Sequence, residues 1–284
     1  MSPVIAALGR PLYPRPERRS PILRASATAV AVTLALARLS AADVWDGLDE
    51  DSATANQLAH GAEQVHDLAV RNGPIADQDW FRISIPARSS FEVVVDGVAS
   101  DVGSDSDQFL TLVHSAGDVV KASAAMLPGK AGRSLTYENP TPDDYVGKFA
   151  RVRSQGCGTS CGREAVYVIR GYDTTCAAAR FNDTGTQTTI LVIQNAAVAS
   201  LAPSVGGHVW FWDEAGALLG SAAFSLGRRQ SLVLNTAAVP GIAGTRGSIT
   251  ISHDGSYGQL AGKAVAVEPA TGFTFDTPLV VRPR

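Results

Sequence analysis

The chain has 284 residues, of which 45% are hydrophobic and 18% charged, and its formal net charge is −3. This composition excludes a disordered chain, a coiled coil and a collagen-like repeat. Only four of the 24 basic residues are lysines and no basic cluster follows residue 40, which argues against a nucleic-acid-binding protein.

The first 42 residues have the pattern of a secretory signal peptide. A basic stretch is followed by an apolar run over 25–37 and by the small residues Ser40, Ala41 and Ala42. These are the three parts of an export signal, although a basic tail with a short amphipathic helix is the alternative. The apolar run is too short to cross a membrane, so we expect a secreted, extracellular protein that is not membrane-spanning. Cleavage after residue 42 would leave an acidic body of net charge −8, which disfavours binding to phosphate polymers or anionic lipids.

The body of the chain alternates apolar and polar residues in short runs bounded by Gly, Pro, Asn and Asp. Such runs predict β-strands. They occur at 80–85, 91–95, 109–114, 119–120, 145–153, 164–170, 188–194, 208–213, 218–224, 231–235, 248–252, 264–268 and 273–277. One strand in about ten residues is typical of β-sandwiches, so the sequence predicts an all-β protein. Helix-period stretches are scarce, and residues 53–70 form the only ambiguous one in the mature chain.

The strands fall into two halves of ordinary sandwich size. Small and polar residues over 174–185 separate them, and we expect a linker there. This predicts two β-sandwich domains, over 56–173 and 186–284. Residues 43–55 are expected to form a flexible N-terminus of the mature protein.

Four motifs stand out in the first half: the Asp-Trp-Phe-Arg strand at 79–87, the Asp-led strand at 105–112, the Gly-led strand at 147–152 and Tyr167-Val-Ile. In their order and spacing they resemble the motifs of bacterial pre-peptidase C-terminal (PPC) domains. The resemblance covers about residues 54–172. It implies a jelly-roll-like sandwich that serves as a non-catalytic appendage of secreted proteins, often proteases, and in some cases binds calcium or extracellular polymers. The sequence departs from the family in the Cys pair of loop 154–162 and in having no protease domain.

The second half is similar to an uncharacterised β-rich module of bacterial exported proteins. The similarity lies in residues 207–216 and 262–272. It implies an architecture, which we expect to be an Ig-like sandwich, and no activity.

One motif, Gly158-Thr-Ser-Cys-Gly162, matches the G-x-S-x-G pattern of a nucleophile elbow. An elbow needs a strand before the serine and a helix after it, whereas here a strand follows. A chain with 27 glycines also produces such a match by chance. We therefore predict no catalytic residue.

Three cysteines pose a pairing question. Cys157 and Cys161 lie in one hairpin tip, and Cys176 follows the returning strand at a distance of roughly 30 Å, since a strand rises ~3.3 Å per residue. A disulfide needs Cα atoms within about 7 Å. In an oxidising compartment this favours a Cys157–Cys161 disulfide, with a fold-back of the loop onto Cys176 as the alternative.

Three aspartates, Asp101, Asp105 and Asp107, crowd a Gly/Ser-rich loop. Their carboxylates could supply several oxygens to calcium, although the pattern is not an EF-hand loop. Solvated turn residues are the simpler interpretation. Asp77 and Asp79 are interpreted as a turn residue and a strand start.

The residues His208, Trp210 and Trp212 alternate with Val209 and Phe211, so the two sets face opposite sides of one strand. If the second set faces the core, both indoles lie on the surface, where they could stack on sugar rings. If the indoles face inward, they are core residues, which the usual burial of Trp favours.

These observations together predict a secreted, non-catalytic protein that binds an extracellular polysaccharide or protein surface, with calcium as its one candidate cofactor. A structural component of the cell envelope or matrix is the alternative, and a secreted serine hydrolase is a third hypothesis. An exposed Trp pair would favour binding, and a large apolar patch without a groove would favour assembly. A cleft joining Ser160 to His253 or His208 would favour the hydrolase.

Overall fold

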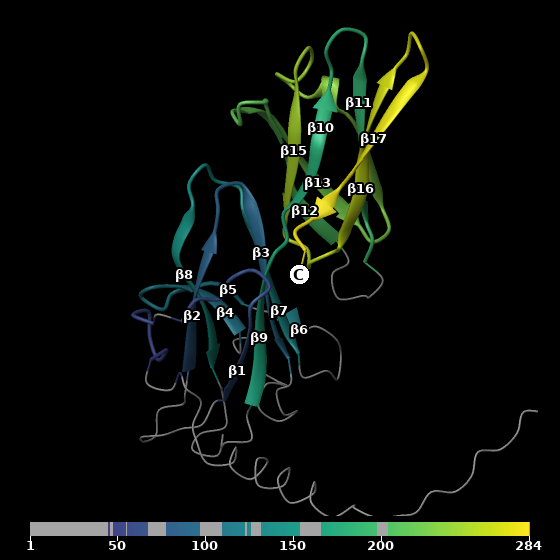
Figure 1. The fold of residues 1–284 in the computed structure, drawn as a ribbon. Helices are drawn as coiled ribbons and strands as arrows, with labels where there is room; N and C mark the ends of the chain where they lie inside the picture. The colour runs from purple at the N-terminus through teal and green to yellow at the C-terminus, as the bar shows by residue number, and fades with distance from the viewer. Residues whose placement is uncertain are drawn as a thin grey trace, which may run out of the picture. The chain divides into compact units, whose positions relative to one another are not determined.

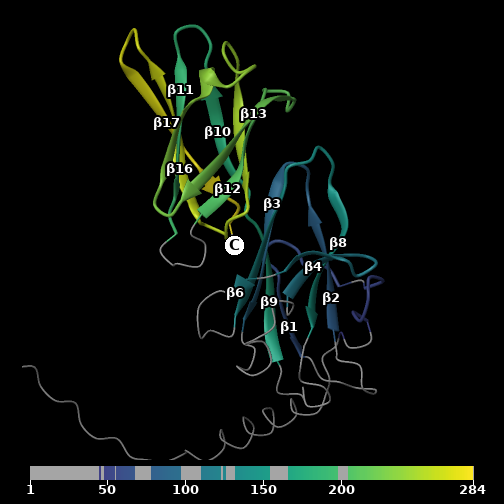
Figure 2. The same cartoon turned by 180° about the vertical axis from the view of Figure 1, so that it is seen from behind.

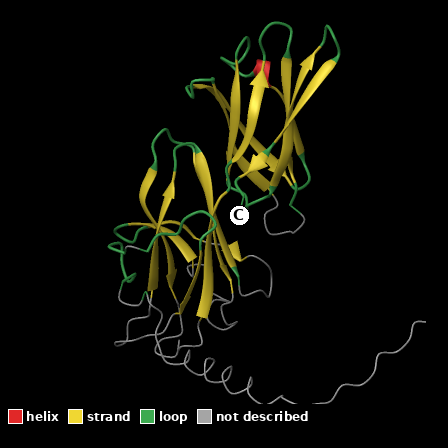
Figure 3. Cartoon of the chain, viewed as in Figure 1, coloured by secondary structure: helices red, strands yellow, loops and turns green. Residues whose placement is uncertain are grey.

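The computed structural model describes residues 45, 48–54, 56–67, 78–96, 110–122, 124–125, 132–153, 166–197 and 204–283 (Figure 1). All of them belong to one compact unit, Ala42–Arg284. Strands dominate this part of the chain (Figure 3), and the one helical element within the described residues is the short 3-10 helix η2 (Thr236–Ala238). The all-β prediction is confirmed. The expected signal peptide lies outside the described residues. Among the described residues, no helix is long and apolar enough to cross a membrane.

The first half forms two antiparallel sheets. One has the strand order β2-β8-β4-β5 and the other β1-β9-β3-β7-β6. The strands are β1 (Glu63–Asp67), β2 (Gln78–Ile85), β3 (Ser89–Asp96), β4 (Leu110–His114), β5 (Val119–Ala122), β6 (Ala124–Ala125), β7 (Arg133–Asn139), β8 (Tyr145–Arg153) and β9 (Val166–Asp173).

The first core lies between these two sheets. Alternate residues of β2, namely Phe81, Ile83 and Ile85, face inward from one sheet, as the period-2 pattern predicts. Tyr167 and Ile169 of β9 face them from the other sheet. The two apolar faces therefore bury each other, which makes this half a β-sandwich.

The segment before β1 is part of the first sandwich. The amide of Trp80 donates to the carbonyl of Asp49 at 2.7 Å, and the amide of Arg82 donates to the carbonyl of Asn56 at 2.8 Å. Asp49 and Thr54 are buried. The flexible N-terminus expected over 43–55 is therefore not what the described residues 48–54 form. The reason is that β2 is an edge strand, and its backbone groups are satisfied by this segment.

The second half forms two further antiparallel sheets (Figures 1 and 2). Their strand orders are β13-β12-β15-β10-β18 and β14-β11-β16-β17. The strands are β10 (Cys176–Asn182), β11 (Thr188–Asn195), β12 (Ser204–Trp212), β13 (Leu218–Gly227), β14 (Ser231–Asn235), β15 (Arg246–His253), β16 (Leu260–Glu268), β17 (Phe273–Pro278) and β18 (Val280–Val281).

The second core is separate from the first. It includes Phe181, Val209 and Phe211 from one sheet and Leu191 and Ile193 from the other. The rings of Phe181 and Phe211 meet edge to face with centroids 5.4 Å apart. The second half is therefore also a β-sandwich.

Most of the linker expected over 174–185 is instead a strand. Residues 176–182 form β10, which pairs with both β15 and β18, and its Cys176 and Phe181 are fully buried. Only two residues, Thr174 and Thr175, connect β9 to β10. The sequence pattern did not predict this strand, because a bulge between Ala178 and Phe181 interrupts the alternation of its side chains.

Candidate functional site

Several residues that the sequence singled out lie outside the part of the chain that the structure describes. They are Asp101, Asp105, Asp107, Cys157, Ser160 and Cys161. The calcium and disulfide hypotheses therefore stay predictions. The remaining cysteine, Cys176, is a free thiol in the second core, where burial raises its pKa to about 12.

The row of His208, Trp210 and Trp212 lies on β12, on the face opposite to Val209 and Phe211. Because Val209 and Phe211 are fully buried in the second core, the row faces away from that core. The predicted alternation is confirmed. Facing away from the core does not leave these side chains open, however, because other residues cover them.

Trp210 is only 6% exposed. Its Nε1 donates to Ser252 Oγ at 2.9 Å, the His208 ring stacks on it, and the Arg88 guanidinium lies 5.6 Å from its ring centre. Trp212 is half-buried, and Arg88 lies 5.8 Å from its ring centre. The open indole pair that would favour sugar stacking is therefore not found in this structure, and that role of the row stays a prediction.

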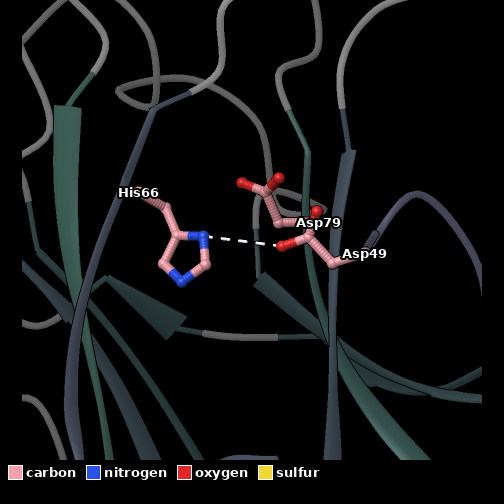
Figure 4. Close-up of side chains that lie close together, drawn as sticks. All are labelled: Asp49, His66 and Asp79. Carbon is pink, nitrogen blue, oxygen red and sulfur yellow. Dashed lines mark ion pairs between the residues drawn. The ribbon is translucent and has the colours of Figure 1, made fainter. Parts of the chain in front are cut away.

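A buried polar cluster, formed by Asp49, His66 and Asp79, was not expected from the sequence (Figure 4). One ligating atom of each residue lies within 4.8 Å of those of the other two. His66 Nδ1 is 3.5 Å from Asp49 Oδ2. Each of the three residues is 1% exposed.

Period-2 geometry places two of these side chains inside the first sandwich. Asp79 is two residues before Phe81 on β2, so it points to the same inner side. On β1, Val65 is exposed and its neighbour His66 is therefore buried. Asp49 reaches the cluster from the turn before β1, which is held by its backbone bond to Trp80.

Neighbouring side chains fix the orientation of the cluster. Tyr167, the cross-strand partner of His66, donates its hydroxyl proton to Asp79 Oδ2. The His66 ring is stacked with the rings of Tyr167 and Trp45, with ring centroids 5.7 Å and 6.1 Å apart, respectively. Its Nε2 lies 3.0 Å from Gln64 Oε1, which leaves Nδ1 directed toward the carboxylates (Figure 4).

The donor set of the cluster is one imidazole nitrogen and two carboxylate oxygens. Such a set can hold a divalent metal ion, or a protonated histidine between two acids. The three residues are 17 and 13 positions apart, and this spacing matches no metal motif. The sequence therefore carried no signal for the cluster. Its members meet because β1 and β2 belong to the two facing sheets of the first sandwich and because the segment that carries Asp49 is bonded to β2.

His253, a partner named in the hydrolase hypothesis, is fully buried. Its Nε2 donates to the carbonyl of Thr174 at 2.9 Å, and its Nδ1 accepts from the amide of Gly255 at 3.1 Å. Burial lowers the pKa of His253 to about 4. Both ring nitrogens are engaged in structural bonds, so this residue does not support the hydrolase hypothesis.

An exposed aromatic pair, Phe273 and Phe275, lies on β17 in the second sandwich. Phe273 is 75% exposed and Phe275 is 58% exposed. They are two residues apart, so both rings point to one side of the strand. Arg180 of β10 places its guanidinium 5.7 Å from the ring centre of Phe275. The sequence marked this segment only as a strand and gave the pair no role.

The sequence matches no family model, and no curated protein matches it. The resemblances to PPC domains and to the exported β-rich module therefore stay predictions.

Solved structures give only weak likenesses. A β-glucuronidase of glycoside hydrolase family 2 has a TM-score of 0.18 at 11% identity, over 82% of this chain and 26% of its own. A Bacteroides uniformis β-glucuronidase has a TM-score of 0.18 at 9% identity, and the match covers 72% of this chain and 26% of the glucuronidase chain. The N-terminal tandem CBM22-1-CBM22-2 domain of Paenibacillus barcinonensis Xyn10C has a TM-score of 0.17 at 9% identity, and the match covers 79% of this chain and 92% of the tandem domain. The chain thus spans about a quarter of the length of the glucuronidases. TM-scores this low carry no conclusion about function.

Proposed function

We propose that the chain is a secreted, non-catalytic binding protein for an extracellular polymer or a cell-surface partner. The observation that carries this proposal is the exposed aromatic pair, Phe273 and Phe275, on β17 of the second sandwich. The export pattern of residues 1–42 supports the extracellular location of the partner.

The position of the pair favours a binding surface over an extension of the core. In the β16–β17 ladder, Ala264 faces Thr277, Ala266 faces Phe275 and Glu268 faces Phe273. Ala264 is buried in the core, so both phenylalanines lie on the same side as the core but nearer the hairpin turn. The core-facing side of the hairpin therefore continues into solvent as an aromatic surface.

Leaving two phenyl rings in water is unfavourable, and a partner that covers them removes this cost. A phenylalanine side chain gains roughly 1.5–3 kcal/mol when it is fully buried. Flat aromatic faces suit both the apolar face of a sugar ring and an apolar protein surface. Arg180, whose guanidinium lies over Phe275, adds a charged donor beside the rings.

The proposal is tested by retention of the protein on insoluble polysaccharides, fibrous proteins and bacterial envelope fragments. The test variant is Phe273→Ser/Phe275→Ser. Its matched control is Leu218→Ser, which removes a partly exposed apolar side chain from β13 in the other sheet of the same sandwich. We expect the wild type and the control to be retained on one matrix and the double variant to be retained at least tenfold less.

Equal retention of the double variant and the wild type would contradict the assignment of this surface. Assembly is the second candidate, favoured by the exposed Val233 on β14 of the same sheet. Light scattering of the unbound protein separates the two functions. A protein that self-associates and is retained on no matrix would favour assembly over binding.

A further inference from the structure

We propose that Asp49, His66 and Asp79 form a binding site for one divalent transition-metal ion of the zinc type. The site lies in the first sandwich and does not depend on the proposed function, which concerns the second sandwich. It carries a structural role, because its three ligands come from the turn before β1, from β1 and from β2.

The separations between the ligating atoms fit such an ion. Zinc binds nitrogen and oxygen at about 2.0–2.2 Å with tetrahedral geometry, which places neighbouring ligand atoms about 3.4 Å apart. The distance between His66 Nδ1 and Asp49 Oδ2 is 3.5 Å. All three ligating atoms lie within 4.8 Å of one another, so a side-chain shift of about 1 Å closes the set around an ion.

The hydrogen bonds of Gln64 define which nitrogen of His66 faces the carboxylates as an acceptor. The Gln64 amide nitrogen donates to the carbonyl of Gln57 at 3.1 Å, which identifies the other amide atom as the oxygen. That oxygen lies 3.0 Å from His66 Nε2 and must accept a proton from it. In the neutral ring Nδ1 therefore carries a lone pair, and this lone pair faces a carboxylate oxygen of Asp49. A divalent metal ion between these two atoms would accept both lone pairs.

The surroundings of the cluster fit a metal ion. Asp49 and Asp79 are each 1% exposed, and a divalent ion bound between two buried carboxylates lowers the cost of burying their charges. Tyr167 holds Asp79 by a hydrogen bond, and Gln64 holds the distal nitrogen of His66. Such outer partners are characteristic of metal sites, where they fix the tautomer and direction of the ligands.

The imidazole ligand selects the class of metal. Calcium and magnesium prefer sites made entirely of oxygen, whereas an imidazole nitrogen together with carboxylates suits zinc and its neighbours in the first transition row. The proposed site is distinct in sequence from the calcium candidates Asp101, Asp105 and Asp107.

The test uses the full chain, stripped with a chelator and transferred to chelator-free buffer. Bound zinc is measured by elemental analysis after dialysis, and thermal unfolding is followed with added Zn²⁺, Mn²⁺ or Ca²⁺. We expect one equivalent of zinc per chain. At free Zn²⁺ 100-fold above the Kd, the unfolding midpoint should rise by roughly 5–10 °C.

Variants assign the binding to the cluster. Asp79→Asn keeps the shape of the ligand but removes its charge, and we expect the zinc-dependent shift to disappear. Tyr167→Phe keeps the buried ring and should weaken zinc binding by about 10–100-fold. Asp118→Asn, in the exposed turn between β4 and β5, is the matched control and should bind like the wild type. All of these variants retain the three cysteines, so zinc bound by thiols does not distinguish them.

Three results would overturn the proposal. They are no saturable zinc binding by the wild type, equal zinc binding by wild type and Asp79→Asn, and stabilisation by Ca²⁺ but not by Zn²⁺ or Mn²⁺. If Asp79→Asn does not fold, the wild-type titration and Tyr167→Phe decide the matter alone.

Discussion

Lowering the pH should destabilise the second sandwich through His253. The folded protein holds this ring neutral, because it is buried, its Nε2 donates to Thr174 and its Nδ1 accepts from Gly255. A proton on Nδ1 would face the Gly255 amide donor. The nearby carboxylates of Asp254 and Asp173 offset only part of this effect on the pKa.

The size of the effect follows from the pKa in the two states. It is about 4 in the folded protein and 6.5 in the ordinary, solvated state. Above pH 6.5 the ring is neutral in both states, so His253 contributes its full stability. Between pH 6.5 and 4 only the unfolded chain takes up the proton, so the free energy of unfolding falls as the pH falls. The loss attributable to His253 is about 2 kcal/mol at pH 5 and approaches roughly 3.4 kcal/mol at lower pH.

Urea denaturation at pH 7.5, 6.5, 5.5 and 5.0 measures this loss. Carboxylates also titrate at low pH, so the wild type is compared with His253→Gln, which has the same carboxylates and no titrating ring. We expect the wild type to lose about 2 kcal/mol more than the variant between pH 7.5 and 5.0. Equal losses in the two proteins would refute the buried neutral state of His253.

Three further predictions concern the second sandwich. Phe211→Ala removes a fully buried ring and should lower the free energy of unfolding, measured by urea denaturation, by about 3–5 kcal/mol. Phe275→Ala removes an exposed ring and should lower it by less than about 1 kcal/mol. Similar losses in the two variants would contradict the core assignment. Gly207→Ala places a Cβ 2.1 Å from the Ser252 carbonyl oxygen and should lower the free energy of unfolding by at least about 2 kcal/mol. At the adjacent Gly206 an added Cβ meets its nearest atom at 3.6 Å, so Gly206→Ala should have a free energy of unfolding within about 1 kcal/mol of the wild type. Cys176, with its pKa raised to about 12, should resist alkylation in the native protein and react after unfolding, as peptide mass mapping can show; fast native labelling would place the thiol elsewhere.

Strands with clean alternation were predictable from the sequence. The structure gives β14 the expected bounds, 231–235, and its side chains alternate between exposed and half-buried along the whole strand. β8 also has its expected bounds, 145–153. Strands with other patterns were not. β7 and β10 were missed, since β7 mixes charged and polar residues and β10 carries small residues and a bulge.

The candidate sites were less predictable than the fold. The alternation of Val209 with Trp210 was readable, but the cover that Arg88 gives to Trp210 depends on a distant segment of the chain. The Asp49–His66–Asp79 cluster likewise depends on cross-strand register and on a turn that carries no strand pattern. A linear motif records neighbours along the chain, whereas these contacts arise between segments far apart in sequence.

The segment before β1 has a consequence for how the protein keeps itself from aggregating. An open edge strand offers unpaired amides and carbonyls to any other strand in solution, and β2 lies at such an edge. Residues 49–58 occupy part of that edge through the backbone bonds of Asp49, Asn56 and Leu58 to β2. A chain shortened to begin at residue 59 would uncover it, and the first sandwich would then present a template for intermolecular strand addition. By occupying this edge, residues 49–58 should hinder fibril-like association of the first sandwich.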